Sequence, residues 1–170
     1  MPGARYHQLL DALLDSWDRN NTIMLNLLRA IPEGGLDAKA TAAGHTVAQQ
    51  FMHFHHERLV SVSEEAREFG RPVPKDEWAA ERDRNRIAEM LSDSAAAVRD
   101  AVRGRLLAGR DLDLHYDHPV LLLQMLLWHE GYHHGQIKLA LKIAGFPIGD
   151  DEAGPLTWDV WRKRRTNVET

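Results

Sequence analysis

Hydrophobic residues recur at steps of three and four along most of the chain, which is the period of an amphipathic helix. The clearest case runs from about Tyr6 to Ala30, and Pro32 and Gly34 then end the pattern. Its apolar stripe consists of Leu9, Leu10, Leu13, Leu14, Trp17, Met24, Leu27, Leu28 and Ile31. The pattern predicts a first long helix. Asn20 and Asn21 fall on or beside this stripe, either as breaks in the seam or as the lining of a polar pocket.

Three further helices are predicted by the same period together with start and stop signals. One is expected from the N-cap Thr46 to about Phe69, one from about Asp83 to Leu107, and one from Pro119 to about Ala144. Proline at the first helical position and glycine just past the last one, here Gly145, are typical of helix ends. The first half of the last helix is apolar nearly all round. We therefore expect it to be the most buried of the four.

The connections between these helices are polar, and no stretch alternates in the way of a strand. The longest connection runs from Gly70 to about Arg82, and Trp78 is expected to anchor it on the core. Trp158 and Trp161, three residues apart, predict a short helix that packs back on the bundle. The pattern predicts an all-α fold, a four-helix bundle with a short C-terminal helical extension, in which residues 1–170 form a single domain.

Composition narrows the classes of partner. Of the 170 residues, 21 are basic and 25 are acidic, so the net charge is −4, and none is cysteine. This balance argues against a nucleic-acid partner, which demands clustered positive charge. The one basic cluster, Arg162 to Arg165, is interpreted as a solvated helix end or tail. The lack of cysteine excludes disulfides, thiolate metal sites and cysteine nucleophiles.

Neither secretion nor a membrane span is predicted. The N-terminus lacks the basic-then-apolar order of a secretory signal. The longest apolar stretch, Val120 to Trp128, is interrupted by Gln124 and is too short to cross a bilayer. We therefore expect a cytoplasmic protein without a membrane partner.

The chemical signal of the sequence is its histidines, ten in all. His129 and His133 are four residues apart on the predicted last helix, so they project from one face about 6 Å apart along the axis. Two imidazoles in this arrangement can bind one divalent metal ion. A lone core histidine is more often hydrogen-bonded than metal-bound. A pair that faces a bundle interior, with a further histidine available on another helix, favours the metal.

The third ligand is expected from the second helix, because a catalytic zinc normally takes three protein ligands and keeps one position open. That helix offers His53, His55 and His56. His53 and His56 lie on nearly the same face, while His55 lies on the opposite side of the axis from His53. Periodicity favours His53 or His56 and does not choose between them.

Two segments resemble a known family. Trp128 to Ile137, WHEGYHHGQI, resembles the H-x-x-x-H-R-G-Q signature of the DinB-like (YfiT-like) metalloenzyme superfamily. Thr46 to His53, TVAQQFMH, is similar to that family's second-helix segment, and the order and length of the helices match over nearly the whole chain. The signature has arginine where this chain has His134, so a role of that arginine is not carried over.

The resemblance implies a four-helix bundle, frequently dimeric, with His53, His129 and His133 as metal ligands and water completing the shell. Zinc is the expected ion, with nickel or iron as alternatives. The family includes enzymes in which the metal activates a low-molecular-weight thiol, which suits a chain without cysteine. We therefore expect a homodimeric metalloenzyme such as a thiol-dependent transferase, with a small-molecule substrate and a low-molecular-weight thiol as co-substrate. The alternatives are a metal-dependent hydrolase and a non-catalytic dimeric stress-response bundle with a structural metal.

A competing motif covers the same histidines. The run HEGYH from His129 to His133 satisfies H-E-x-x-H, the zinc motif of many metalloproteases, in which the glutamate is the general base. Glu130 is thus a candidate catalytic residue, and Glu152 a candidate third ligand in this interpretation. Such proteases place this helix beside a substrate-binding sheet, so the lack of predicted strands favours the bundle. Further candidates to surround the metal or line a pocket are Asn21, Gln50 and Tyr132.

Overall fold

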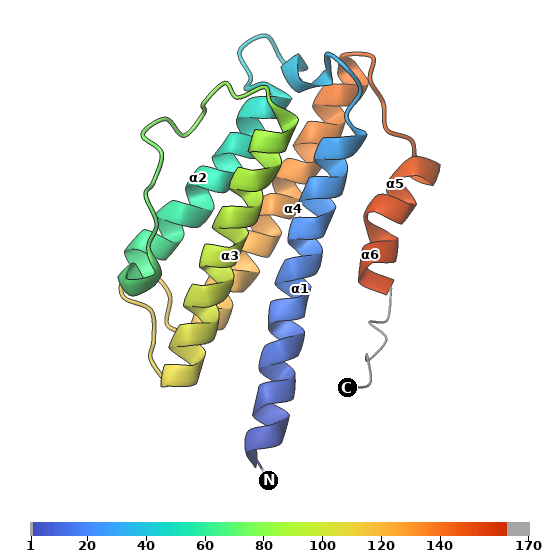
Figure 1. The fold of residues 1–170 in the computed structure, drawn as a ribbon. Helices are drawn as coiled ribbons and strands as arrows, with labels where there is room; N and C mark the ends of the chain where they lie inside the picture. Colours follow the sequence, from blue (N-terminus) through green and yellow to red (C-terminus); the bar gives the residue numbers. More distant parts are fainter. Residues whose placement is uncertain (1, 163–170) are drawn as a thin grey trace.

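Four long helices lie side by side in the computed structural model, which describes residues 2–162 (Figure 1). They are α1 (Pro2–Ala30), α2 (Val47–Glu65), α3 (Arg84–Ala108) and α4 (Pro119–Ile143). Two short helices, α5 (Asp150–Leu156) and α6 (Trp158–Arg162), contact α1, and the 3-10 turns η1 (Gly35–Asp37) and η2 (Arg67–Phe69) lie in the connections. These residues contain no strand. The predicted all-α bundle with a C-terminal helical extension is confirmed.

The predicted helix ends are largely confirmed, because short polar side chains and glycines fix them. Thr46 and Gln49 form a capping box at the start of α2. His118 caps α4, with Pro119 at the first helical position, and Gly145 beyond its end has a φ of +87°. Three differences remain. α1 begins at Pro2, four residues before the predicted start. α2 ends at Glu65 and its predicted last turn is η2, and α5 occupies a segment for which no helix was predicted.

The core consists of two apolar clusters that follow one another along the bundle. The first is built around Met24, Leu28, Phe51, Leu91, Ile137 and Leu141. The second is built around Leu14, Trp17, Leu59, Val98, Leu122 and Leu126. Each of the helices α1, α2 and α4 contributes side chains to both clusters. Between these two sets of side chains lie Asn20 in α1, Arg58 in α2 and Glu130 in α4, and all three are buried. A polar layer therefore separates the two clusters.

The prediction that the last long helix is the most buried was wrong. In α2, 13 of 19 residues are buried, against 8 of 25 in α4. The apolar pattern of α4 covers two faces, of which only one meets the core. The other face carries the exposed side chains Leu121, Trp128, Tyr132, Leu139 and Ile143.

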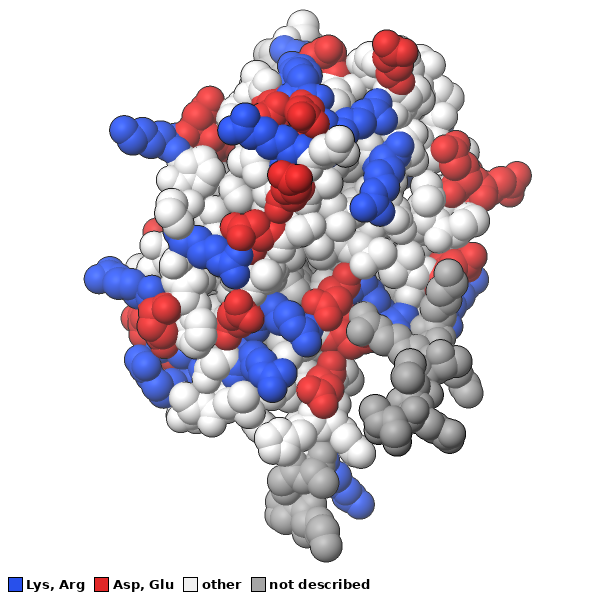
Figure 2. Space-filling model, viewed as in Figure 1, with Lys and Arg blue, Asp and Glu red and all other residues white. Residues whose placement is uncertain are grey.

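The outer surface carries charges of both signs. Figure 2 shows acidic and basic side chains interspersed over the face seen in Figure 1. Of the predicted basic cluster, Arg162 ends α6, and residues 163–165 lie outside the described part of the chain. Among the helices of residues 2–162, none is long and apolar enough to cross a membrane.

The packing of η2 against α3 depends on a glycine. A Cβ added at Gly104 would lie 2.1 Å from Cζ of Phe69, closer than any real contact. We expect Gly104→Ala to lower the free energy of unfolding by about 1–3 kcal/mol, measured by urea denaturation, because overpacking forces neighbouring groups to move. Gly131→Ala is the matched control. A Cβ there meets nothing within 4 Å, so this change is expected to be neutral or stabilising by up to about 1 kcal/mol. Equal stability of the two variants would contradict the packing argument.

Candidate metal centre

Helices α2 and α4 bring together the three histidines that the resemblance implies. Nε2 of His53 lies 3.1 Å from Nε2 of His129. The ring of His133 is centred 4.8 Å from that of His53 and 4.6 Å from that of His129. Each residue offers a nitrogen within 4.8 Å of the nitrogens of the other two. Among the three candidates of the second helix, His53 is the one that meets the α4 pair.

This cluster fits a divalent ion. Zinc bound tetrahedrally by imidazoles at about 2.1 Å holds its ligand nitrogens roughly 3.4 Å apart, close to the separation of the His53 and His129 nitrogens. Nδ1 of His133 is buried and has no hydrogen-bond partner within the protein. Buried imidazole nitrogens without partners are costly unless something else satisfies them. The Nε2 atoms of His53 and His129 are within hydrogen-bond distance of each other, and an ion held by the three rings would replace that contact.

Burial and neighbouring rings keep the imidazoles of His53 and His133 in the neutral form, which is the form that binds metal. Burial, together with the neighbouring rings of His133 and His129, lowers the pKa of His53 to about 3. Burial and His129 lower the pKa of His133 to about 4, and the side chain of Gln136 acts in the opposite direction. Both rings are therefore neutral at pH 7, and neutral imidazole is the ligand form.

The connection between α2 and α3 covers the ring of His53. The indole of Trp78 stacks on that ring with centroids 4.3 Å apart and an interplanar angle of 6°. His45 stacks on the other side of the indole at 3.5 Å. Nε2 of Gln49 donates a hydrogen bond to the backbone oxygen of Trp78. Trp78 thus anchors its segment on a candidate ligand, whereas the sequence predicted an anchor on the apolar core.

Glu77 is the carboxylate next to this ligand. Its Oε1 lies 2.8 Å from Nδ1 of His53, at ion-pair distance although not aligned as a hydrogen bond. Carboxylates in this position orient a metal-binding histidine and raise its basicity. No periodic pattern runs through this segment, so sequence reasoning missed Glu77. His53, Glu57 and Glu77 form a second group with ligand atoms within 4.8 Å of one another. We favour the three histidines because two helices hold all of them.

We expect Glu77→Gln to weaken divalent-metal binding by about 10- to 100-fold, the usual effect of removing such a carboxylate. Competition with a chromophoric chelator measures the affinity. Glu81→Gln, in the same connection but outside both groups, is the control and should leave the affinity unchanged. An affinity that Glu77→Gln leaves intact would show that His53 needs no carboxylate to orient it.

Glu130 does not join the histidines. It is only 1% exposed and Arg58 is fully buried. Nε of Arg58 donates to Oε1 of Glu130 at 2.6 Å, and Nη2 donates to Oε2 at 2.8 Å. Asn20 also donates to Oε2, while Asn21 accepts from Arg58. The two asparagines therefore line a buried ion pair. This geometry gives Glu130 a structural position and does not favour the general-base interpretation of H-E-x-x-H.

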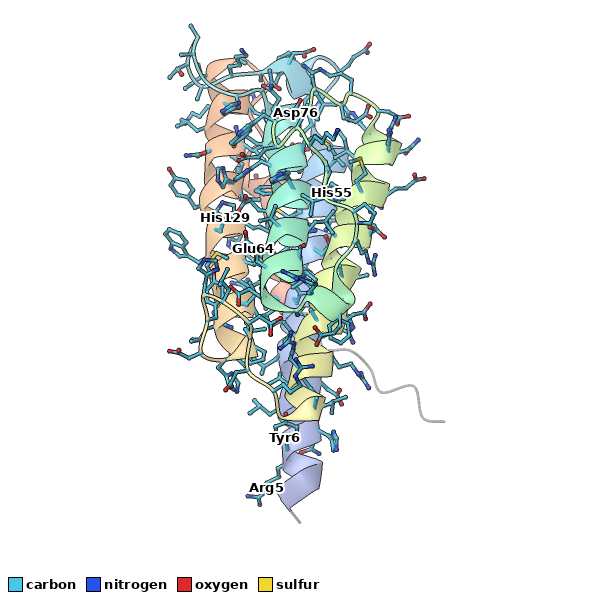
Figure 3. The ribbon with its side chains drawn as sticks, turned by 90° about the vertical axis from the view of Figure 1, so that its left-hand side faces the viewer. Arg5, Tyr6, His55, Glu64, Asp76 and His129 are labelled. Atoms are coloured by element: carbon cyan, nitrogen blue, oxygen red, sulfur yellow. The ribbon has the colours of Figure 1, made fainter. Side chains whose placement is uncertain are left out.

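The remaining candidates lie around the cluster. His55 points to α3, where its Nδ1 lies 2.8 Å from the Met90 oxygen; Figure 3 shows it on the other side of α2 from His129. His56 is half-buried near Glu57 and belongs to neither metal-capable group. Tyr132 is 55% exposed and stacks on Trp128. Glu152 is exposed on α5 and also belongs to neither group.

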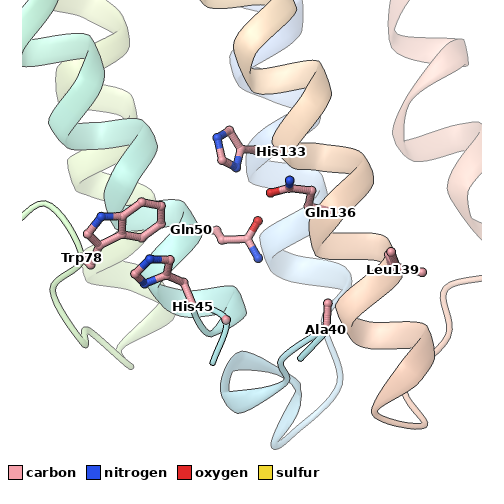
Figure 4. A pocket seen from close by; sticks show the side chains of 8 residues that line it. Ala40, His45, Gln50, Trp78, His133, Gln136 and Leu139 are labelled. Carbon is pink, nitrogen blue, oxygen red and sulfur yellow. The ribbon is translucent and has the colours of Figure 1, made fainter. Parts of the chain in front are cut away.

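A cavity of about 280 Å³ opens beside the cluster. His133 and Gln136 of α4 form one wall (Figure 4). Gln50 of α2 faces them, and Trp78 and His45 lie on the same side as Gln50. Of the sequence candidates for a pocket, Gln50 is thus placed in one, and a small molecule in this cavity would lie next to a candidate ligand.

Fold and site together define a class, the helical bundle with a candidate histidine metal site on two neighbouring helices. The family comparison gives the particular family. The model of the DinB family matches residues 6–154, so the chain belongs to the DinB family, which includes proteins described as metalloenzymes. Neither the curated proteins nor the solved structures contain a match to this chain.

Proposed function

We propose that this protein is a divalent-metal-dependent enzyme acting on a small molecule, and specifically a transferase that uses a low-molecular-weight thiol. The observation that carries the proposal is the cavity next to His133, one of three clustered histidines. A divalent ion supplies Lewis acidity that lowers the pKa of a thiol or water reaching it. Three imidazoles are a common ligand set for catalytic zinc, and nickel and iron also bind imidazole ligands.

The residues of this chain have distinct parts in the proposal. His53, His129 and His133 hold the ion, and Glu77 keeps the ring of His53 in place. Trp78 covers that ring and excludes water from one side of it. The chain has no cysteine, so a reacting thiol has to come from a second small molecule. Low-molecular-weight thiols are therefore the co-substrate class in this proposal.

Two alternatives differ in what they require of the same site. A hydrolase needs only water beside the ion and no thiol. A structural metal in a stress-response bundle is normally closed by four protein ligands. In the part of the chain that the structure describes, three histidines cluster and one of them lines a cavity. This arrangement supports a site that keeps a position for an outside ligand.

Cobalt-substituted protein tests the proposal. We expect one Co²⁺ per chain, a new ultraviolet absorption band when 2-mercaptoethanol is added, and thiol-dependent conversion of 1-chloro-2,4-dinitrobenzene. His133→Ala should lose all three signals. Hydrolysis of p-nitrophenyl acetate without a thiol effect would favour the hydrolase. A cobalt spectrum that neither thiol nor imidazole changes would favour the structural metal.

The homodimer is proposed from the exposed face of α4. Leu121, Trp128, Tyr132, Leu139 and Ile143 follow one another at steps of seven and four, so they form one stripe along the helix. Trp128 is 71% exposed. A continuous apolar stripe at this spacing is typical of a helix that packs on another helix. A second copy of α4 presents the same stripe and is its natural complement.

We expect Trp128→Glu to convert a dimer into a monomer of 19.3 kDa, because it places a charge at the most exposed residue of the stripe. Light scattering coupled to gel filtration measures the mass. Leu114→Glu is the control, since Leu114 is equally exposed but lies outside α4. A wild-type protein that is monomeric at all concentrations, or a dimeric Trp128→Glu protein, would contradict the proposed interface.

A further inference from the structure

The cavity beside the three histidines contains a polar group without a partner. Gln50 is only 6% exposed, and its Oε1 is buried and accepts no hydrogen bond from the protein. A buried carbonyl oxygen left in this state costs about 1–3 kcal/mol. Gln50 precedes His53 by three residues on α2, so both side chains lie on the same face of the helix. Figure 4 shows the Gln50 amide reaching from α2 toward Gln136 of α4.

The cavity wall has no acidic side chain, no lysine and no arginine. Its side chains are the amides of Gln50 and Gln136, the rings of His45, His133 and Trp78, and small or aliphatic groups such as Leu139. An ionised group placed against such a wall finds no charged side chain to pair with, so hydrogen bonds and an ion at the three histidines are left to hold a ligand. The volume of about 280 Å³ lies just below the roughly 300–1,000 Å³ of cavities that hold drug-sized ligands.

We propose that this cavity binds a small molecule that reaches the three-histidine centre and donates a hydrogen bond to Oε1 of Gln50. Gln50 is thereby a specificity-determining residue, because it accepts ligands with an N–H or O–H group in this position and disfavours analogues without one. The inference rests on the proposed function, since it assumes a metal at the three histidines.

The test compares imidazole with 1-methylimidazole on cobalt-loaded protein. Both bind metals through one ring nitrogen, but only imidazole keeps an N–H on the other. We expect imidazole to bind about five- to tenfold more tightly, as measured by the visible absorption of Co²⁺, because the missing hydrogen bond leaves Oε1 of Gln50 unsatisfied.

Two variants isolate the role of Gln50. Gln50→Met keeps the length of the side chain and removes the acceptor, so the preference for imidazole should disappear. Gln50→Asn shortens the side chain and moves the amide away from the ligand, so it should reduce the preference for imidazole over 1-methylimidazole. This second variant keeps the test decisive if the methionine variant is poorly folded. Gln136→Met is the matched control on the opposite wall and should affect both azoles alike.

The outcomes separate this inference from the proposed function. Cobalt-loaded protein that binds the two azoles equally, or that keeps its preference in both Gln50 variants, overturns the inference and leaves the metal site standing. Protein that takes up no cobalt overturns the inference together with the proposed function.

Discussion

Replacement of His129 by alanine is expected to abolish tight binding of a divalent ion. Its Nε2 lies 3.1 Å from that of His53, so the two rings share one position for a metal. Loss of a direct ligand should exceed the roughly 10- to 100-fold effect of a supporting carboxylate. His53→Ala and His133→Ala should have the same result. Metal analysis after dialysis and chelator competition measure the number of ions per chain and their affinity.

Two controls make this result specific. His55→Ala removes a buried histidine of the same helix whose Nδ1 faces Met90, so it should leave metal affinity unchanged. Glu57→Gln removes a member of the second metal-capable group only. If Glu57→Gln weakened binding while His129→Ala did not, the ion would belong to the group of His53, Glu57 and Glu77. Unchanged metal content in all three histidine variants would refute the candidate site.

The second large effect is expected on stability. Arg58→Met should lower the free energy of unfolding by roughly 3–5 kcal/mol, because it leaves the buried Glu130 carboxylate without its partner. Glu130→Leu should cost a similar amount by leaving the guanidinium unpaired. The double variant should be much less destabilised than the sum of the two, since no uncompensated charge remains. Urea denaturation of the four proteins completes the cycle.

A surface pair gives the comparison. Arg82 and Asp37 are 2.7 Å apart but well exposed, so Arg82→Met should cost no more than about 1 kcal/mol. Additive effects of Arg58→Met and Glu130→Leu would show that the pair is not coupled. A Glu130→Gln protein with wild-type stability and no activity would instead restore the general-base interpretation of the H-E-x-x-H motif.

Much of the bundle followed from local signals in the sequence. Thr46, Asp83 and Pro119 marked helix starts because caps and prolines act through neighbouring backbone groups, which are known from sequence alone. The pair His129 and His133 was recognisable for the same reason, since their spacing fixes their common face. Choosing His53 from three histidines needed the family resemblance, because the rotation of α2 against α4 is a tertiary property.

What the sequence left undetermined depends on contacts between distant segments. Glu77 and Trp78 lie next to His53 but belong to an irregular connection. In such a segment no periodic pattern predicts which way a side chain points. The buried ion pair joins Arg58 of α2 to Glu130, which lies 72 residues away in the sequence, so no local pattern predicts it. The burial of α4 was overestimated, because an apolar pattern does not distinguish a face that meets the core from one left for another chain.

The stacking of Trp78 on His53 has an optical consequence. The indole lies face to face with a candidate ligand, so its emission should be sensitive to an ion on the other side of that ring. Cobalt and nickel quench excited indoles at short range, whereas zinc leaves them emissive. Trp128, Trp158 and Trp161 are exposed to solvent and Trp17 is buried in the second apolar cluster. The fluorescence of this chain thus contains a built-in reporter of metal occupancy that needs no added label.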